Sequence, residues 1–157
     1  MSDFYTARFA ATYSYGEDAA EVELVRYGRT MLREEPTRTW SAPYEEHQLV
    51  GGAWSRVVPS GNASLTLGLS LLLPAPRVAL AEEAARRLEY ELMLHREGEL
   101  VLLEAFDGDC PMLQTVWRAV VTACESKLCS AEEAPPMRDG TAWALVTLEF
   151  LLTDQED

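Results

Sequence analysis

The chain has 157 residues, enough for one domain with a sizeable core but too few for two self-sufficient domains. Hydrophobic residues make up 48% of the chain and occur in patterned blocks, which excludes a wholly disordered protein. The net charge of −13, from 26 acidic and 13 basic residues, disfavours binding to nucleic acids or anionic membranes, because both require clustered Lys and Arg. No apolar run approaches the ~20 residues of a membrane-spanning helix.

The N-terminal third begins with two predicted strands. Alternating aromatic and small residues over Phe4–Tyr15 predict the first, whose odd-numbered side chains share one face because strand side chains alternate with a period of two. Gly16-Glu17-Asp18 indicates a turn. Glu21–Tyr27 is the second strand, closed by Gly28.

A long polar connection follows these strands. Residues 29–46 are charged and interrupted by Pro36 and Pro43, which predicts a long extended loop with a short strand around Thr37–Trp40. A loop of this length inside a compact domain is often functional.

Two further strands are predicted after this loop, and the second of them, Ala63–Leu73, is the best candidate for the centre of the core. Leu49–Val58 is a predicted strand in which Gly51-Gly52 allows a bulge or a sharp bend. Pro59–Asn62 is a strong turn signal. Ala63–Leu73 is the clearest strand of the chain, because its leucines occupy every second position from Leu65 and so share one face.

A single segment has the period of a helix. Ala79–Arg96 is predicted to be helical, with Pro76 at the first helical position and Gly98 just beyond the end. Its apolar face combines small and large side chains at three- and four-residue steps, which suits packing against a sheet: Ala81, Ala84, Ala85, Leu88, Leu92 and His95.

Three more strands complete the predicted sheet: Glu99–Phe106, Leu113–Cys124 and Thr141–Leu152. A polar excursion, 126–140, separates the last two, and a polar tail, 153–157, ends the chain. The sequence therefore predicts one α+β, β-rich domain over residues 1–157. We expect an antiparallel β-sandwich or partial barrel with one flanking helix.

No motif for chemistry accompanies this pattern. His47 in the polar loop and His95 near the helix end have no evident catalytic partners, and such histidines are usually solvent-facing or capping. Cys110, Cys124 and Cys129 lack a common zinc spacing, which favours reduced thiols, and Cys124 on a strand favours a buried, inert one. We therefore expect no enzyme, no catalytic residues, no cofactor and no metal.

Aromatic residues in and beside the polar loop are the best candidates for a functional surface. Trp40, Tyr44 and Trp54 lie in segments that otherwise look exposed, and Arg38 is close by. Aromatic residues and Arg are enriched at interface hot spots, which favours a subunit interface at these four residues. The same aromatics could equally form a satellite hydrophobic cluster under the loop.

The order of the segments resembles the tail-module fold of long-tailed bacteriophages, which tail tube proteins share with the N-terminal domain of distal tail proteins. The likeness runs through most of residues 20–153. It is carried by the run from Gly51 to Leu69, the helix at Ala79–Arg96, and the strands Leu100–Leu103, Trp117–Val121 and Leu145–Phe150.

This resemblance implies a structural protein of a phage or prophage tail. Copies would assemble into rings, often hexameric, by joining their sheets around a channel, with residues 29–46 as an inter-subunit arm. The implied partners are further copies and other tail proteins. The implied location is the cytoplasm before assembly and the virion tail afterwards. An acidic channel would let DNA pass without binding it.

Two other functions compete with this one. A small-molecule-binding β-barrel or sandwich would need an internal pocket lined by residues such as Trp117 and Trp143. An enzyme using carboxylates would need a pair such as Glu104 with Asp107 or Asp109, and no acidic pair stands out in so acidic a chain.

Overall fold

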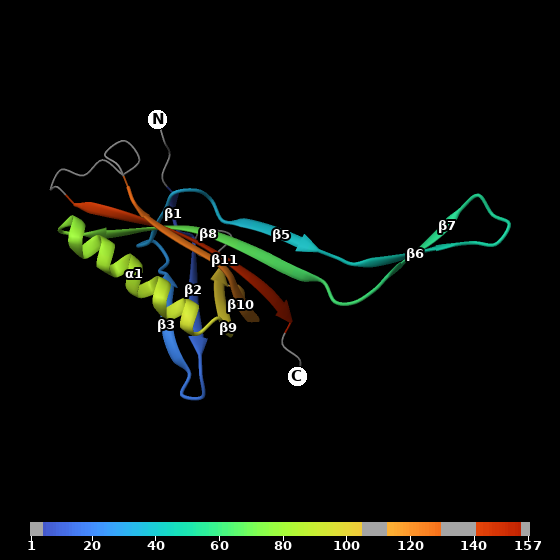
Figure 1. The fold of residues 1–157 in the computed structure, drawn as a ribbon, viewed down its shortest axis with the longest axis horizontal. Coiled ribbons are helices and arrows are strands. Elements are labelled where there is room, and N and C mark those ends of the chain that lie inside the picture. Colours follow the sequence, from blue (N-terminus) through green and yellow to red (C-terminus); the bar gives the residue numbers. More distant parts are fainter. Residues whose placement is uncertain (1–4, 105–112, 130–140, 155–157) are drawn as a thin grey trace.

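The computed structural model describes residues 5–104, 113–129 and 141–154; over these it shows one helix beside a curled sheet, from which a thin two-stranded arm projects (Figure 1). Cys110, Asp107 and Asp109 lie outside the described residues. The elements in chain order are β1 (Tyr5–Thr6), β2 (Phe9–Tyr15), β3 (Ala20–Val25), β4 (Met31–Leu32), β5 (Thr37–Ser41), β6 (Tyr44–Gln48), β7 (Ser55–Pro59), β8 (Ser64–Ala75), α1 (Val78–Leu94), β9 (Glu97–Glu104), β10 (Leu113–Leu128) and β11 (Ala142–Asp154).

The main sheet is antiparallel and curls back toward itself. Its strand order is β1-β4-β8-β11-β10-β9-β2-β3, with β5 also paired to β8. β1 and β2 stand far apart in this order, yet only Ala7 and Arg8 separate them along the chain. The N–H of Ala7 donates to the Thr30 carbonyl at 3.0 Å, and the N–H of Gly28 donates to the Ala7 carbonyl at 2.8 Å. The half-barrel with one flanking helix confirms the predicted α+β class and partial barrel.

The core fills the concave face of this half-barrel. On β8, Leu65, Leu67, Leu69 and Leu71 are buried, as their alternation predicts. β8 pairs with β11, whose core face carries Phe150 opposite Leu67. Leu73 continues this face as predicted, because it is half-buried and packs against the core.

The helix begins and ends slightly earlier than predicted. Arg77 is the extended N-cap residue, so Pro76 precedes the helix instead of occupying its first position, and His95 is the C-cap. The helix packs on β8, β10 and β11 through a face narrower than predicted, because Ala84 and His95 are exposed. Its buried residues are Ala81, Ala85 and Leu92.

The prediction of a long extended loop over residues 29–46 is wrong, because this segment forms strands. Residues 29–46 contain β4, β5 and most of β6, of which only β5 matches the short strand predicted there. The predicted strand Leu49–Val58 is correct only in its second half, which lies in β7. Its first half is wrong, because Gly51 and Gly52 lie in a turn that reverses the chain between β6 and β7, where the sequence allowed a sharp bend. The physical reason is exposure: β5 and β6 bury none of their side chains, so no apolar alternation marks them as strands.

The C-terminal strands are longer than predicted. β10 continues beyond Cys124 to Leu128, with an irregular register between Val121 and Ala123, and so takes in the start of the predicted polar excursion. β11 extends to Asp154, two residues into the predicted polar tail. Hydrogen bonding between β10 and β11 holds these polar ends extended, because a ladder needs no apolar side chains.

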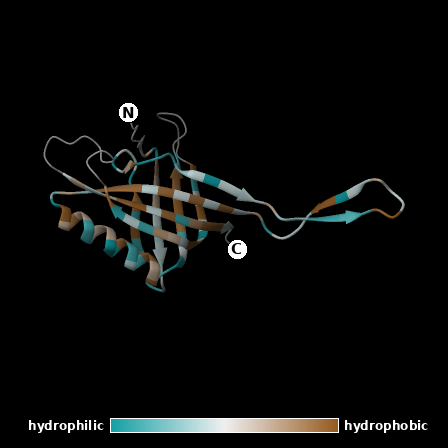
Figure 2. Ribbon diagram, turned by 45° about the horizontal axis from the view of Figure 1, so that its top comes forward, coloured by the Kyte–Doolittle hydropathy of each residue, from teal (hydrophilic) through white to brown (hydrophobic). Residues whose placement is uncertain are grey.

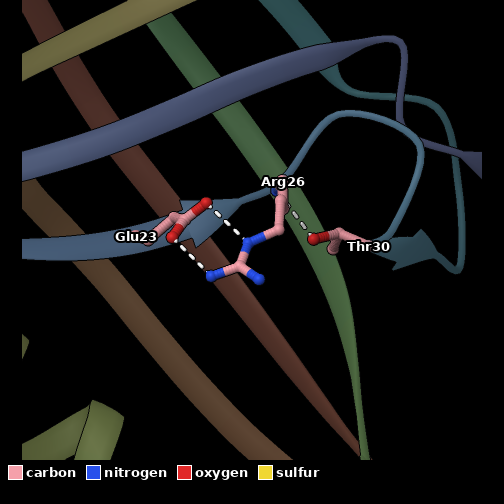
Figure 3. Close-up of polar contacts among 3 residues, drawn as sticks. All are labelled: Glu23, Arg26 and Thr30. Atoms are coloured by element: carbon pink, nitrogen blue, oxygen red, sulfur yellow. Dashed lines mark hydrogen bonds and ion pairs between the residues drawn. The ribbon is translucent and has the colours of Figure 1, made fainter.

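A polar cluster fixes the connection from β3 to β4 (Figure 3). The Arg26 guanidinium donates two 2.8 Å hydrogen bonds to the Glu23 carboxylate, and the Arg26 backbone N–H donates to Thr30 Oγ1 at 2.8 Å. The hydrogen bonds from Arg26 lower the pKa of Glu23. The cluster shapes the turn that delivers the chain to β4 and then to β5, where the arm begins.

Candidate interaction surface

The arm, residues 42–63, contains a second sheet, separate from the main one. β6 and β7 pair antiparallel, from Tyr44 opposite Pro59 to Gln48 opposite Ser55. At the root, the Ser60 N–H donates to the Pro43 carbonyl at 3.0 Å. Figure 1 shows the arm running on from the ends of β5 and β8 and away from the half-barrel.

The turn between β6 and β7, residues 49–54, forms the tip of the arm. The Gly52 N–H donates to the Leu49 carbonyl at 3.2 Å, and the Leu49 N–H donates to the Trp54 carbonyl at 3.4 Å. Gly51 has a φ of 74°, the left-handed conformation that glycine adopts at little cost. A chain reversal is therefore built into the sequence at this point.

Apolar side chains on the arm face water. Val50 is fully exposed, Trp54 is 79% exposed and Tyr44 is 65% exposed. Leu49 and Val57 are exposed as well, and Figure 2 shows the hydrophobic colouring of the tip beside the hydrophilic β6. An isolated two-stranded hairpin is marginally stable in water, and several large apolar side chains exposed on one short segment favour an interaction site. The arm thus has the properties of a surface that is completed by a partner.

The four predicted interface residues do not form one cluster. Tyr44 lies on the arm and Trp54 at its tip, whereas Arg38 and Trp40 lie on β5. Arg38 Nη1 forms an ion pair with Glu104 Oε1 of β9 at 2.7 Å. Trp40 packs edge-on against Trp117 of β10, with ring centroids 5.9 Å apart, and stays 56% exposed. The contacts of Arg38 and Trp40 therefore connect β5 to β9 and β10.

Leu49, Val50 and Val57 were not predicted as surface residues, because they were placed together in one strand, Leu49–Val58. The available signal was Gly51-Gly52 between two short runs of strand-forming residues, which is a hairpin pattern.

A small cavity lies at the mouth of the half-barrel, beside the beginning of β5. This mouth pocket has a volume of about 230 Å³. Phe9, Leu67 and Leu102 supply its apolar floor, and Pro36 borders it. Its polar rim consists of Arg8, Arg38 and Glu104.

The two tryptophans expected to line an internal pocket lie on opposite faces of the sheet. Trp117 packs against the core cluster. Trp143 is buried, but its neighbour Ala144 belongs to the core, so Trp143 points to the other face. Its indole N–H is buried without a hydrogen-bond partner among the described residues. The expected pocket between Trp117 and Trp143 is therefore not formed.

The histidines lie in unrelated settings. His47 is on the arm, with Nε2 3.3 Å from a carboxylate oxygen of Glu45. His95 stacks on Tyr15 with ring centroids 4.0 Å apart, and its carbonyl accepts a 2.6 Å hydrogen bond from the Tyr13 hydroxyl. Within residues 5–104, 113–129 and 141–154, no group of three His, Cys, Asp or Glu side chains could hold a metal ion. In the same ranges, no helix is long and apolar enough to span a membrane.

Cys124 is expected to react slowly with iodoacetamide at pH 8. Burial, with a smaller contribution from Glu89, raises the pKa of its thiol to about 11, so roughly one thiol in a thousand is ionised at pH 8. The folded state holds the thiol proton of Cys124 more tightly than the unfolded state does. The contribution of this thiol to the free energy of unfolding is therefore complete below its ordinary pKa and is lost as the pH rises toward 11. Mass spectrometry of the Cys124 peptide should show fast labelling only in urea. Equal labelling rates in buffer and urea would contradict this assignment.

The sequence matches no protein-family model and no curated protein. The function is therefore inferred from the arm and the mouth pocket.

Proposed function

We propose that this protein is a structural subunit that assembles with copies of itself through the arm, as a component of a phage or prophage tail. The observation that carries the proposal is the arm itself. Tyr44, Val50 and Trp54 expose apolar surface on a hairpin that projects away from the half-barrel. A partner that covers this surface would also stabilise a hairpin that is marginal alone.

The tail assignment has further support from sequence and architecture. The segment order resembles the phage tail-module fold, and a half-barrel with one flanking helix is the architecture which that resemblance implies. The net charge of −13 suits a channel through which DNA passes without binding. In this proposal, copies form rings, often hexameric, and other tail proteins are the further partners, in the virion tail.

Removing the arm tests the proposal. Replacing residues 44–59 with Asn-Gly would join Pro43 to Ser60 through a two-residue hairpin turn and keep the β5–β8 pairing. We expect the wild-type protein to form larger species with rising concentration, seen by light scattering and as rings or short tubes in negative stain. We expect the armless variant to weaken this association at least ~100-fold, because it loses several hot-spot side chains together.

The control is the thermal unfolding transition of the armless variant, which should stay close to that of the wild-type protein. A wild-type protein that is monomeric at every concentration would contradict the proposal. Equal assembly with and without the arm would show that another surface carries the contacts.

A small-molecule-binding barrel is the second candidate function, because the mouth pocket combines an apolar floor with a few polar side chains. Its volume of about 230 Å³ is below the roughly 300–1,000 Å³ of drug-sized ligand sites, so its ligand would be smaller than a drug-sized molecule. A thermal-shift screen that found a stabilising ligand, together with a monomeric wild-type protein, would favour this function over assembly.

A further inference from the structure

We propose that the tip of the arm of one copy seats in the mouth pocket of another copy. This inference rests on the proposed self-assembly and names the surface that receives the arm. Its two halves, the tip and the pocket, are both present in every copy.

The tip presents a plug of suitable chemistry. Trp54 is its largest apolar side chain, and Val50 in the same turn is fully exposed. Tryptophan is the residue most enriched at interface hot spots, where it fills an apolar pocket and is shielded by polar neighbours. The mouth pocket offers an apolar floor of Phe9, Leu67 and Leu102 beneath a polar rim.

The charges of the two surfaces are complementary. The pocket rim carries two arginines, Arg8 and Arg38, against one carboxylate, Glu104. Arg8 is exposed, whereas Arg38 already pairs with Glu104. β6 carries the exposed carboxylates Glu45 and Glu46 just behind the tip, against a single arginine on β7. A basic rim is a distinctive feature in a chain with a net charge of −13, and it favours an acidic partner segment.

The length of the arm indicates that its tip enters the pocket of a different copy. About nine extended residues separate Ser41 from the tip at Val50, which at ~3.3 Å per residue places the tip roughly 30 Å from the end of β5. The mouth pocket lies beside Pro36 and Arg38, at the beginning of β5, and is therefore farther from the tip than the root of the arm is. A paired hairpin cannot fold back sharply on its own root without breaking its ladder, so the tip meets the pocket of another molecule.

Such a contact joins two different surfaces and is therefore heterologous. Each copy gives one arm and receives one, so the contact propagates head to tail. Heterologous contacts build closed rings when the rotation between copies closes, and open filaments when it does not. The inference thus predicts chains or rings rather than symmetric dimers.

A mixing experiment tests this arrangement. Trp54→Ser disables the tip but leaves the pocket, and Arg8→Glu reverses the charge of the rim but leaves the tip. We expect Trp54→Ser to weaken self-association at least about 30-fold and Arg8→Glu about tenfold. At a concentration where each variant alone is monomeric, an equimolar mixture should form one-to-one pairs by light scattering, because one intact tip and one intact pocket remain.

Two matched variants serve as controls. Tyr90→Ser removes an aromatic side chain on α1 that is 71% exposed, and it should leave assembly unchanged. Arg8→Lys should retain most of the association. Circular dichroism should show the same fold for all four variants.

The outcomes separate the inference from the proposed function. Assembly of Arg8→Glu at wild-type strength would overturn the pocket as the acceptor. Loss of assembly in Tyr90→Ser would place the acceptor on α1 instead. Assembly of Trp54→Ser at wild-type strength would overturn the tip as the donor, while an assembly-deficient armless variant would still support the proposed function. A wild-type protein that stays monomeric at every concentration would contradict both the proposed function and the seating of the tip in the pocket.

Discussion

Replacing Phe150 with alanine is expected to lower the free energy of unfolding by about 3–5 kcal/mol, the cost of truncating a buried aromatic side chain in a packed core. Phe150 is fully buried at the middle of β11. It lies opposite Leu67 of β8 and Val121 of β10, and its ring centroid is 5.7 Å from that of Tyr13. The cavity left by the substitution would therefore open between β8, β10 and β11 on one side and Tyr13 of β2 on the other.

Urea unfolding followed by fluorescence would measure this loss. Phe150→Leu keeps most of the volume and should cost roughly 1 kcal/mol. Val116→Ala, on the exposed side of β10, should change the stability by less than about 0.5 kcal/mol. A loss below 1 kcal/mol for Phe150→Ala would mean that the concave face is not the principal core.

Gly98→Ala is expected to destabilise the protein by about 2–3 kcal/mol, because the added methyl group has no room. A Cβ at this position of β9 would collide with the backbone carbonyl oxygen of Ser14 and would lie 2.9 Å from Tyr13 Cζ. Tyr13 has little freedom to move aside, because it is fully buried and its hydroxyl donates to the His95 carbonyl. Burial, with contributions from Glu97 and Tyr15, raises the pKa of Tyr13 to about 12.

Gly68→Ala on β8 is the matched control. Its Cβ would lie 3.6 Å from the Thr37 Cβ, an ordinary contact, so this substitution should be neutral within about 1 kcal/mol. Thermal unfolding of both variants side by side would compare them. Equal stabilities would show that the contact between β2 and β9 at Gly98 can relax.

The parts of the fold that bury one face could be predicted from sequence. The leucines of β8 and the helical period of α1 identify these elements because burial imposes alternation or a 3.6-residue period. The arm could not be identified in this way, because β6 buries no side chain and β7 almost none. Gly98 was misassigned for a different reason: a glycine after a helix predicts a cap, whereas its contact with Tyr13 depends on the pairing of β2 with β9.

The candidate site shows the same limit. Tyr44 and Trp54 could be singled out, because exposed aromatic residues stand out in a polar segment. The mouth pocket could not be predicted, because β2, β5, β8 and β9 meet there only through the strand order of the sheet. Arg8 and Glu104 are 96 positions apart in a chain of 157 residues, and no local pattern relates them.

The arm follows β5 and precedes β8 along the chain, so its orientation depends on how these two strands are held. The pairing of Thr37–Ser41 with β8 fixes them, and the Arg38–Glu104 ion pair and the contact of Trp40 with Trp117 add to this pairing. The two ladders are joined by the short connections 42–43 and 60–63, which the hydrogen bond from the Ser60 N–H to the Pro43 carbonyl holds together. A small rotation at these connections would move the tip much farther than it moves the root. The curvature of an assembly would thus depend on how stiffly these two connections hold the arm in each subunit.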